Sequence, residues 1–327
     1  MRLDPAVAAT RLAVRRIVAA PSSGPVLVAC SGGADSLALL AATVFEARSK
    51  RRREPGRVVG VTVDHGLQQG SADRAKAVVD QMAELGADET ACVAVSVDPR
   101  GSGVEAAARE SRYDALRELA GRLGSQRVLV GHTRDDQAET VLMGLTRGSG
   151  GRSIAGMPGV VDGLFFRPFL DLTRAQTEAA CRAQGIKFWT DPHNADPCYT
   201  RARIRHTVMP VLERELGPGV AAALARTGEM LRDDMGLLDG LAEEAYRAAG
   251  GSAGLDVGRL VDLPASVRRR VLRRGALEAG SPGAELFHLH VAELDRLATD
   301  WHGQSGVDLP GRLRAVRADG RIVFRAG

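Results

Sequence analysis

Ser31-Gly32-Gly33-Ala34-Asp35-Ser36 is the stretch that decides the fold. It follows a short apolar run, Pro25–Cys30, and leads into a segment with the leucine spacing of a helix, Ser36–Arg48. Two glycines let the backbone turn sharply and bring its N–H groups close to an anion. Ser36 is well placed to cap the following helix, whose N-terminus favours negative charge. The stretch therefore predicts a phosphate-binding loop formed by residues 31 to 36.

Asp35 makes this loop different from the commonest phosphate loop. The loop is not a Walker A motif, because Gly-Lys followed by Ser or Thr is missing. A carboxylate beside a polyphosphate is repulsive unless a divalent cation lies between them, so Asp35 predicts a bound Mg²⁺. On these six residues alone, an ordinary strand–turn–helix junction with a capping serine is the alternative.

Segments with strand and helix character alternate after this loop. Further strands are expected at Val58–Val63, Cys92–Val97 and Arg127–Val130, and helices at Ser71–Leu85, Glu105–Leu123 and Asp136–Leu145. Such alternation implies parallel strands joined by right-handed crossovers. The N-terminal part is therefore predicted to be an α/β domain with a doubly wound parallel sheet. Ligands of such sheets lie at the carboxyl ends of the strands.

The remainder of the chain has a different pattern. A Gly-rich run at residues 147–163 is typical of a long functional loop, and beyond Pro218 the apolar spacing is almost wholly helical. The last segment, Val307–Phe324, alternates apolar and polar residues around Ala318-Asp319-Gly320 and predicts a terminal hairpin. We therefore expect a catalytic domain over residues 1–217 and a mostly helical domain over residues 218–327.

Polar residues follow two more of the predicted strands. The second strand ends in Asp64 and His65, and the fourth is followed by Gly131 and His132 and then by three acidic residues, Asp135, Asp136 and Glu139. The ends of parallel strands converge on one crevice, so these side chains are expected to share a site with the loop. Asp136 and Glu139 are three residues apart at a helix start and point the same way. A favourable interaction with the helix dipole is the alternative for one acidic pair.

Composition and charge exclude several classes of protein. The 327 residues include no apolar run long enough to cross a membrane, and the N-terminal segment has charges where a signal peptide is apolar. Four cysteines are present without a C-x-x-C pair, which argues against a disulfide framework or a structural metal site. These features predict a reduced, cytoplasmic protein. A net charge of +4 permits a polyanionic partner without requiring one.

The full set of motifs resembles the tRNA(Ile)-lysidine synthetases, a family of PP-loop ATP pyrophosphatases with the adenine nucleotide alpha-hydrolase-like fold. The resemblance runs from about Pro25 to Pro210. Its most specific block is residues 135–140. The other matching stretches are Ser31–Ser36, Asp64-His65-Gly66-Leu67, Ala107-Ala108-Arg109, Arg112-Tyr113, Gly131-His132, Arg147-Gly148-Ser149-Gly150, Arg167-Pro168, Asp191-Pro192 and Arg203-Ile204-Arg205.

The resemblance implies a two-step ligation. ATP adenylates the C2 oxygen of the wobble cytidine in a tRNA(Ile) with the CAU anticodon, and the amine of L-lysine then displaces AMP from C2. It also implies that residues 31–36, with Asp64, His65, Gly131 and His132, bind the nucleotide, and that Asp35 binds Mg²⁺.

Two groups of charged residues are the catalytic candidates. Asp136 and Glu139 are expected to bind the cationic lysine, because an ammonium group in a closed site needs a carboxylate partner. Arg109, Arg112 and Arg205 are expected to stabilise the activated nucleotide and its phosphates, although a surface ion pair is the alternative for each arginine.

The expected partners of the chain are the tRNA and free L-lysine, and a homodimer is possible.

Three positions depart from the family pattern. Thr133 replaces a second His, His193 stands where Ser is usual, and Ala202 replaces an Asn. A related enzyme that thiolates a tRNA base is the nearest alternative, but it would need the missing C-x-x-C pair. A non-catalytic RNA-binding protein is a second alternative, although it would not need a metal site beside phosphates.

Two basic runs lie outside these motifs. Residues 50–53 are expected to form a solvated loop, with contact to tRNA phosphates as the alternative. Five arginines between Arg268 and Arg274 share a helix with a buried side and could bind the tRNA backbone.

Overall fold

The computed structural model describes residues 3–21, 23–49, 56–66, 70–96, 104–147, 150–191 and 195–327. Contacts divide the chain into two compact units. The first consists of Met1–Leu142 and Gly156–Arg226, and the second of Met143–Ala155 and Thr227–Gly327. This division differs from the predicted boundary after residue 217, because two of its three boundaries lie inside helices, where sequence periodicity gives no signal. No helix among the described residues is long and apolar enough to span a bilayer.

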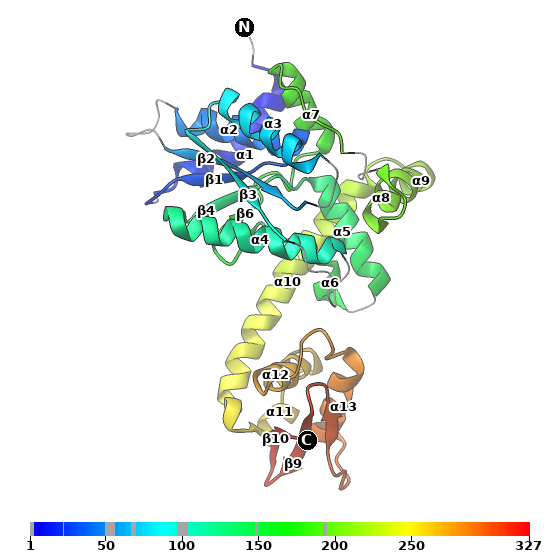
Figure 1. Cartoon of the computed structure of the whole chain (residues 1–327). Coiled ribbons are helices and arrows are strands. Elements are labelled where there is room, and N and C mark those ends of the chain that lie inside the picture. Colours follow the sequence, from blue (N-terminus) through cyan, green and yellow to red (C-terminus); the bar gives the residue numbers. More distant parts are fainter. Residues whose placement is uncertain are drawn as a thin grey trace. The chain divides into compact units, whose positions relative to one another are not determined.

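The first unit contains the predicted parallel sheet (Figure 1). The strand order is β3-β2-β1-β4-β6-β5, and only β5 runs antiparallel to its neighbour. The third strand lies three residues earlier than predicted, because edge pairing with β2 begins at the polar residues Glu89 and Thr90. The strands are β1 (Val26–Ala29), β2 (Val58–Asp64), β3 (Glu89–Ala94), β4 (Arg127–Val130), β5 (Val160–Val161) and β6 (Phe165–Phe166).

Helices cover both faces of this sheet. Val26 and Val28 of β1 pack into the core under α1, α2, α3 and α7, whereas Leu27 points to the opposite face, into the core under α4. Both faces are therefore buried, as a doubly wound sheet requires. The helices are α1 (Pro5–Ala19), α2 (Ala34–Ala47), α3 (Ser71–Glu84), α4 (Val104–Leu123), α5 (Arg134–Arg147) and α7 (Arg174–Ala183). After them come α8 (Thr200–Arg203), the π-helical turn η2 (Ile204–Val208) and α9 (Met209–Glu215).

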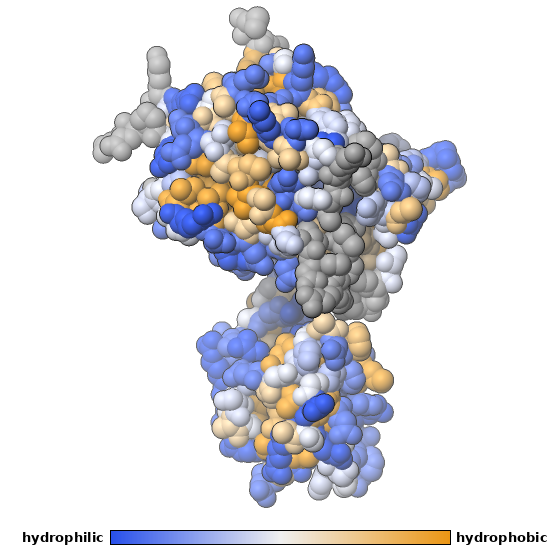
Figure 2. All heavy atoms as spheres, viewed as in Figure 1, coloured by the Kyte–Doolittle hydropathy of each residue, from blue (hydrophilic) through white to orange (hydrophobic). Residues whose placement is uncertain are grey.

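The second unit is mostly helical, with a small antiparallel sheet of order β7-β10-β9-β8. The predicted terminal hairpin forms between β9 and β10, where Asp319 and Gly320 both have positive φ, as a two-residue hairpin turn requires. Hydrophilic residues flank this unit on the face shown in Figure 2. Its elements are α6 (Gly151–Ile154), the C-terminal part of α10 (Val220–Ala248), η3 (Gly251–Ala253), β7 (Leu255–Asp256), α11 (Val257–Val261), α12 (Ala265–Glu278), α13 (His288–Thr299), β8 (Val307–Leu309), β9 (Leu313–Ala318) and β10 (Arg321–Ala326).

Candidate active site

A cavity of about 510 Å³ lies at the carboxyl ends of β1, β2 and β4. Apolar residues of these strands line its inner part, and charged residues from α2, α4, α5, α7 and η2 line the rest. Gly32, Asp64, His65 and Glu139 are predicted site residues that do not line the cavity themselves. The other predicted site residues line the cavity: Ser31, Gly33, Ala34, Asp35, Ser36, Arg109, Arg112, Gly131, His132, Asp136 and Arg205.

The phosphate loop turns as predicted, but its helix cap differs. Gly32 has φ +82°, and a Cβ there would lie 2.8 Å from Val78, so only glycine fits without strain. Gly33, rather than Ser36, is the N-cap of α2. The Ser36 hydroxyl accepts a hydrogen bond from the Ser31 N–H at 3.1 Å and donates to the Gly33 carbonyl at 2.9 Å. The prediction that Ser36 caps the helix was wrong, because the helix begins two residues earlier, at Ala34. Ser36 instead stabilises the loop through its hydrogen bonds to Ser31 and Gly33.

Asp35 lies in the first turn of α2, beside the cavity. Its Oδ1 accepts a hydrogen bond from the Thr177 hydroxyl, and its Oδ2 lies 3.9 Å from Arg174 Nε. Burial is the main reason that the pKa of Asp35 is raised to about 6. A carboxylate in such a position is stabilised in its ionised form by a nearby cation.

Asp136 and Glu139 form an acidic pair that already holds two guanidinium groups. Arg205 donates to Glu139 from Nε at 2.7 Å and from Nη2 at 2.9 Å, and its Nη2 lies 3.2 Å from Asp136. Arg174 Nη2 donates to Asp136 at 3.0 Å. Burial opposes ionisation of Asp136, but Arg174 and the Thr133 backbone hold its pKa below its ordinary value.

Thr133, one of the three departures from the family pattern, contacts Asp136 directly. Its backbone N–H and its hydroxyl both donate to Asp136 Oδ2, at 2.8 and 2.9 Å. Ala202, another departure, is buried in α8. The third, His193, lies outside the described residues, as do Leu67, Gly148, Ser149, Pro192 and the basic run at 50–53.

Arg109 and Arg112 lie one turn apart on α4 and line the cavity together. Arg112 donates to the His65 ring at 3.2 Å, and the Arg109 guanidinium lies 5.0 Å from the centre of the Tyr113 ring. Within the described ranges, neither arginine forms an ion pair with a carboxylate. Arg205, by contrast, pairs with acidic residues. Two unneutralised guanidinium groups at one cavity form a favourable environment for an anion.

His65 and His132 each present a buried Nδ1 atom without a hydrogen-bond partner in the described part of the chain. Loss of water around the ring is the main cause that lowers the pKa of His132 to about 3. Burial, and then the adjacent Arg112, lower the pKa of His65. Both rings are therefore neutral near pH 7, and each can form one more hydrogen bond.

Gly131 and Asp64 have local structural roles. A Cβ on Gly131 would lie 3.0 Å from the Asp35 carbonyl carbon, so glycine allows the end of β4 to approach the phosphate loop. Asp64 Oδ1 accepts from the Gly66 N–H at 2.9 Å, which stabilises the turn after β2. Their assignment as nucleotide-binding residues stays a prediction.

Arg174 and Thr177 are site residues that the sequence motifs do not predict. Both lie on α7, which follows the Gly-rich segment and β6, and neither belongs to a motif at a strand end. The only local signal is Thr173, which caps α7 in a capping box with Gln176 and so places Arg174 at the first helical position. That signal marks a helix start without indicating that its side chains reach the acidic pair.

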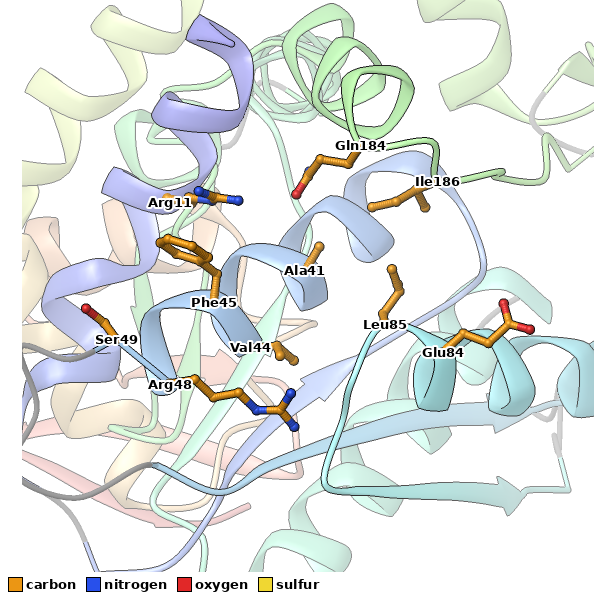
Figure 3. Close-up of a pocket in the computed structure, with 10 residues that line it drawn as sticks. All are labelled: Arg11, Ala41, Val44, Phe45, Arg48, Ser49, Glu84, Leu85, Gln184 and Ile186. Carbon is orange, nitrogen blue, oxygen red and sulfur yellow. The ribbon is translucent and has the colours of Figure 1, made fainter. Parts of the chain in front are cut away.

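A second cavity, of about 710 Å³, lies along α2 (Figure 3). Ala41, Val44 and Phe45 of that helix contribute to its wall, and the Arg11 guanidinium lies 3.4 Å from the centre of the Phe45 ring. None of the predicted site residues lines this cavity. The cavity along α2 is the larger of the two, but it lacks the predicted site residues. The cavity at the strand ends is therefore the candidate active site.

Comparison with known proteins decides the family. A family model described as a PP-loop domain matches residues 8–212. A protein from Streptomyces coelicolor named tRNA(Ile)-lysidine synthase is 49% identical over 99% of both chains, and one of the same name from Thermobifida fusca is 52% identical over 98% of both. The chain belongs to the tRNA(Ile)-lysidine synthase family. A model of the TilS substrate binding domain matches residues 255–323, within the second unit.

Solved structures agree with this fold. The U34-tRNA thiolase NcsA from Methanococcus maripaludis is 18% identical, with a TM-score of 0.55 over 69% of this chain and 79% of that one. At this identity the similarity shows the PP-loop fold alone. Membership of the tRNA(Ile)-lysidine synthase family rests on the relatives at about half identity.

Four of the five arginines in the cluster of the second unit form ion pairs. Arg268 and Arg269 donate to the two oxygens of Asp295 at 2.6 and 2.8 Å, and Arg270 lies 3.2 Å from Asp239. Arg274 pairs with Glu243 at 2.9 Å. Most of the cluster is thus engaged with carboxylates of α10 and α13, which weakens the prediction that it binds the tRNA backbone.

We predict that Asp295→Asn destabilises the second unit by about 2 kcal/mol at pH 7, because charged hydrogen bonds to two arginines are lost. Although burial opposes ionisation, these arginines hold the pKa of Asp295 below its ordinary value. The stabilisation is therefore complete above about pH 4 and is lost as the pH falls through the lower folded-state pKa. Urea unfolding between pH 2 and 7 measures it.

The matched control is Asp308→Asn, which removes an ion pair with Arg314 whose aspartate is 79% exposed. An exposed pair contributes less than about 1 kcal/mol. Equal free energies of unfolding for the two variants at pH 7 would show that the Asp295 pairs do not stabilise the unit.

Proposed function

We propose that this chain ligates L-lysine to C2 of the wobble cytidine of a CAU-anticodon tRNA(Ile). The cytidine is first adenylated by ATP, and lysine then displaces AMP, so that the tRNA reads AUA in place of AUG and carries isoleucine in place of methionine. The observation that carries the proposal is a cavity lined both by the phosphate loop and by Asp136, whose acidic partner Glu139 is buried beside it behind Arg205. The family relationship supports the tRNA substrate and the use of ATP.

The phosphate loop is proposed to bind the pyrophosphate end of ATP. The loop is followed directly by α2, so the partial positive charge of the helix N-terminus faces the phosphates. Apolar side chains from β1, β2 and β4, with Leu116, line the inner cavity and suit an adenine ring.

Asp35 is proposed to hold Mg²⁺ between the phosphates. No group of three or more candidate ligands gathers among the residues described, so the ion would take most of its ligands from phosphate oxygens and water. That arrangement is usual for Mg²⁺ and fits a single, largely buried carboxylate. When bound, the ion neutralises charge on the phosphates as pyrophosphate leaves.

Arg109 and Arg112 are proposed to stabilise negative charge on the α-phosphate of ATP and on AMP as it leaves. In the described part of the chain these guanidinium groups contact the neutral side chains of His65 and Tyr113 and form no ion pair with a carboxylate that an anion would have to replace. The neutral His132 ring, with its buried and unpartnered Nδ1, is proposed to orient a polar group of the substrate.

Asp136 and Glu139 are proposed to bind the ammonium group of the lysine substrate. Glu139 is 2% exposed and Asp136 13%, so a cation between them is largely removed from water. Two carboxylates in such a position compensate for the loss of hydration. To act as the nucleophile, the amine must lose its proton, which a carboxylate of this pair can accept, and it can then attack C2 of the adenylated cytidine as AMP leaves.

The alternatives have less support. A thiolase would need paired cysteines, yet Cys30 and Cys181 are buried, and Cys92 and Cys198 are exposed and far apart in sequence. A non-catalytic binder would not explain a carboxylate beside the phosphate loop. We further propose that the enzyme acts in the cytoplasm, where its substrates are found; the homodimer stays a prediction.

Product analysis tests the adenylation step. With ATP, Mg²⁺, lysine and an unmodified CAU transcript, we expect AMP and pyrophosphate in equal amounts, at a rate that depends on the RNA. A transcript with uridine at the wobble position is the control and should release neither product. Release of ADP, or equal turnover of the two transcripts, would contradict the proposal.

A further inference from the structure

The acidic pair is neutralised before any substrate binds. Asp136 and Glu139 carry two negative charges and contact two guanidinium groups, those of Arg174 and Arg205, at 2.7 to 3.5 Å. A substrate ammonium brought to this pair needs the same carboxylate oxygens that already accept hydrogen bonds from the two arginines. It can bind there only if one of the guanidinium groups leaves.

Arg174 is anchored on several sides. Its backbone N–H donates to Asp135 Oδ2 at 2.8 Å, and the capping box of Thr173 fixes the start of α7. The Thr177 hydroxyl, which contacts Asp35, also lies 2.8 Å from the Arg174 carbonyl oxygen, and the Arg174 side chain itself reaches Asp35. Removing this guanidinium from the acidic pair would disturb the Asp35 site as well.

Arg205 has a different setting. It lies in the π-helical turn η2, between the short helices α8 and α9, at the side of the sheet (Figure 1). π-Helical turns are strained insertions that occur often at functional sites. Arg205 contacts Glu139 through two donors, and its remaining ionic partner is Asp136, so its side chain can leave without breaking another ion pair.

We propose that Arg205 occupies the ammonium position of the lysine substrate in the ligand-free enzyme and leaves when lysine binds. Arg174 stays and positions the acidic pair. The released guanidinium remains at the cavity, where it becomes available to the phosphates, which is the role that the sequence predicts for Arg205. This exchange rests on the proposed lysine substrate.

Equilibrium dialysis of labelled L-lysine against the nucleotide-free full chain tests the exchange. Arg205→Gln removes the competitor, so the Kd for lysine should fall on the order of tenfold. Arg174→Gln makes the same charge change but leaves the competitor, so its Kd should change less than about threefold. Arg205→Lys, which keeps a cation at this position, should bind lysine much as the wild type does.

A chemical probe of the wild type gives a second test that needs no variant. Phenylglyoxal modifies guanidinium groups that are free of ion pairs, and mass spectrometry locates the modified residues. Lysine should increase modification of Arg205 while Arg174 stays protected.

Three results would overturn the exchange. If both Gln variants lower the Kd for lysine equally, the loss of one positive charge near the acidic pair explains the change without any exchange. If Arg205→Gln weakens binding, Arg205 is a permanent part of the lysine site. If lysine leaves the modification of Arg205 unchanged, the side chain does not move. A wild-type chain that binds no lysine would instead contradict the proposed substrate.

Discussion

Asp35→Ala is expected to lower the rate of cytidine adenylation by at least about 10³-fold, because the cation that neutralises the phosphates loses its protein ligand. Asp35 is the acidic residue at the start of α2 and lies at the phosphate loop. The tRNA itself should bind with nearly unchanged affinity, since the substitution alters a side chain inside the nucleotide cavity. Quench-flow measurement of adenylated RNA and filter binding of the transcript test the two expectations separately.

Thr177→Val is the matched control for this substitution. It removes the hydroxyl that donates to Asp35 but keeps the carboxylate and the buried volume. We expect a loss of less than about tenfold, the value of one hydrogen bond. Unchanged adenylation in Asp35→Ala, or an equal loss in both variants, would show that Asp35 does not hold the cation.

Asp136→Asn is expected to raise the KM for lysine by at least about tenfold while leaving the affinity for ATP unchanged. The amide oxygen can still accept the hydrogen bonds that Thr133 donates at 2.8 and 2.9 Å, whereas the amide NH2 group replaces the oxygen that accepts from Arg174 and Arg205. What it loses is the charge that attracts an ammonium group. Initial rates over a range of lysine concentrations, together with ATP binding in the absence of lysine, measure the difference.

Rescue distinguishes this effect from a general loss of activity. A high lysine concentration should restore much of the turnover of Asp136→Asn, since the defect is in binding, but should not restore Asp35→Ala. An unaltered dependence on lysine in Asp136→Asn would remove this residue from the lysine site.

The sheet and the strand-end residues follow from local sequence, because strand and helix periodicities alternate clearly and parallel strands place their ends together. Element boundaries were less predictable. Ser36 has the chemistry of a cap, but the backbone of Gly33 already begins the helix. β3 begins at polar residues because pairing with β2, rather than apolar periodicity, determines where it starts.

Ion-pair partners could not be read from the sequence, because they come from elements far apart in the chain. Arg174 lies 38 residues from Asp136, and nothing near it indicates that contact. The arginines from Arg268 onward suggest an RNA-binding surface when read alone, yet most of them form ion pairs with Asp295 or with carboxylates of α10. A charged run therefore predicts a surface only after its folded partners are known.

Transfer of labelled lysine to RNA tests the proposed reaction most directly. The full chain is incubated with ATP, Mg²⁺, labelled L-lysine and a CAU tRNA(Ile) transcript, and nuclease digestion then locates the label. The account predicts one lysine per transcript, on the wobble cytidine, and none when ATP is omitted. RNA that carries no label while AMP accumulates would contradict the lysine ligation.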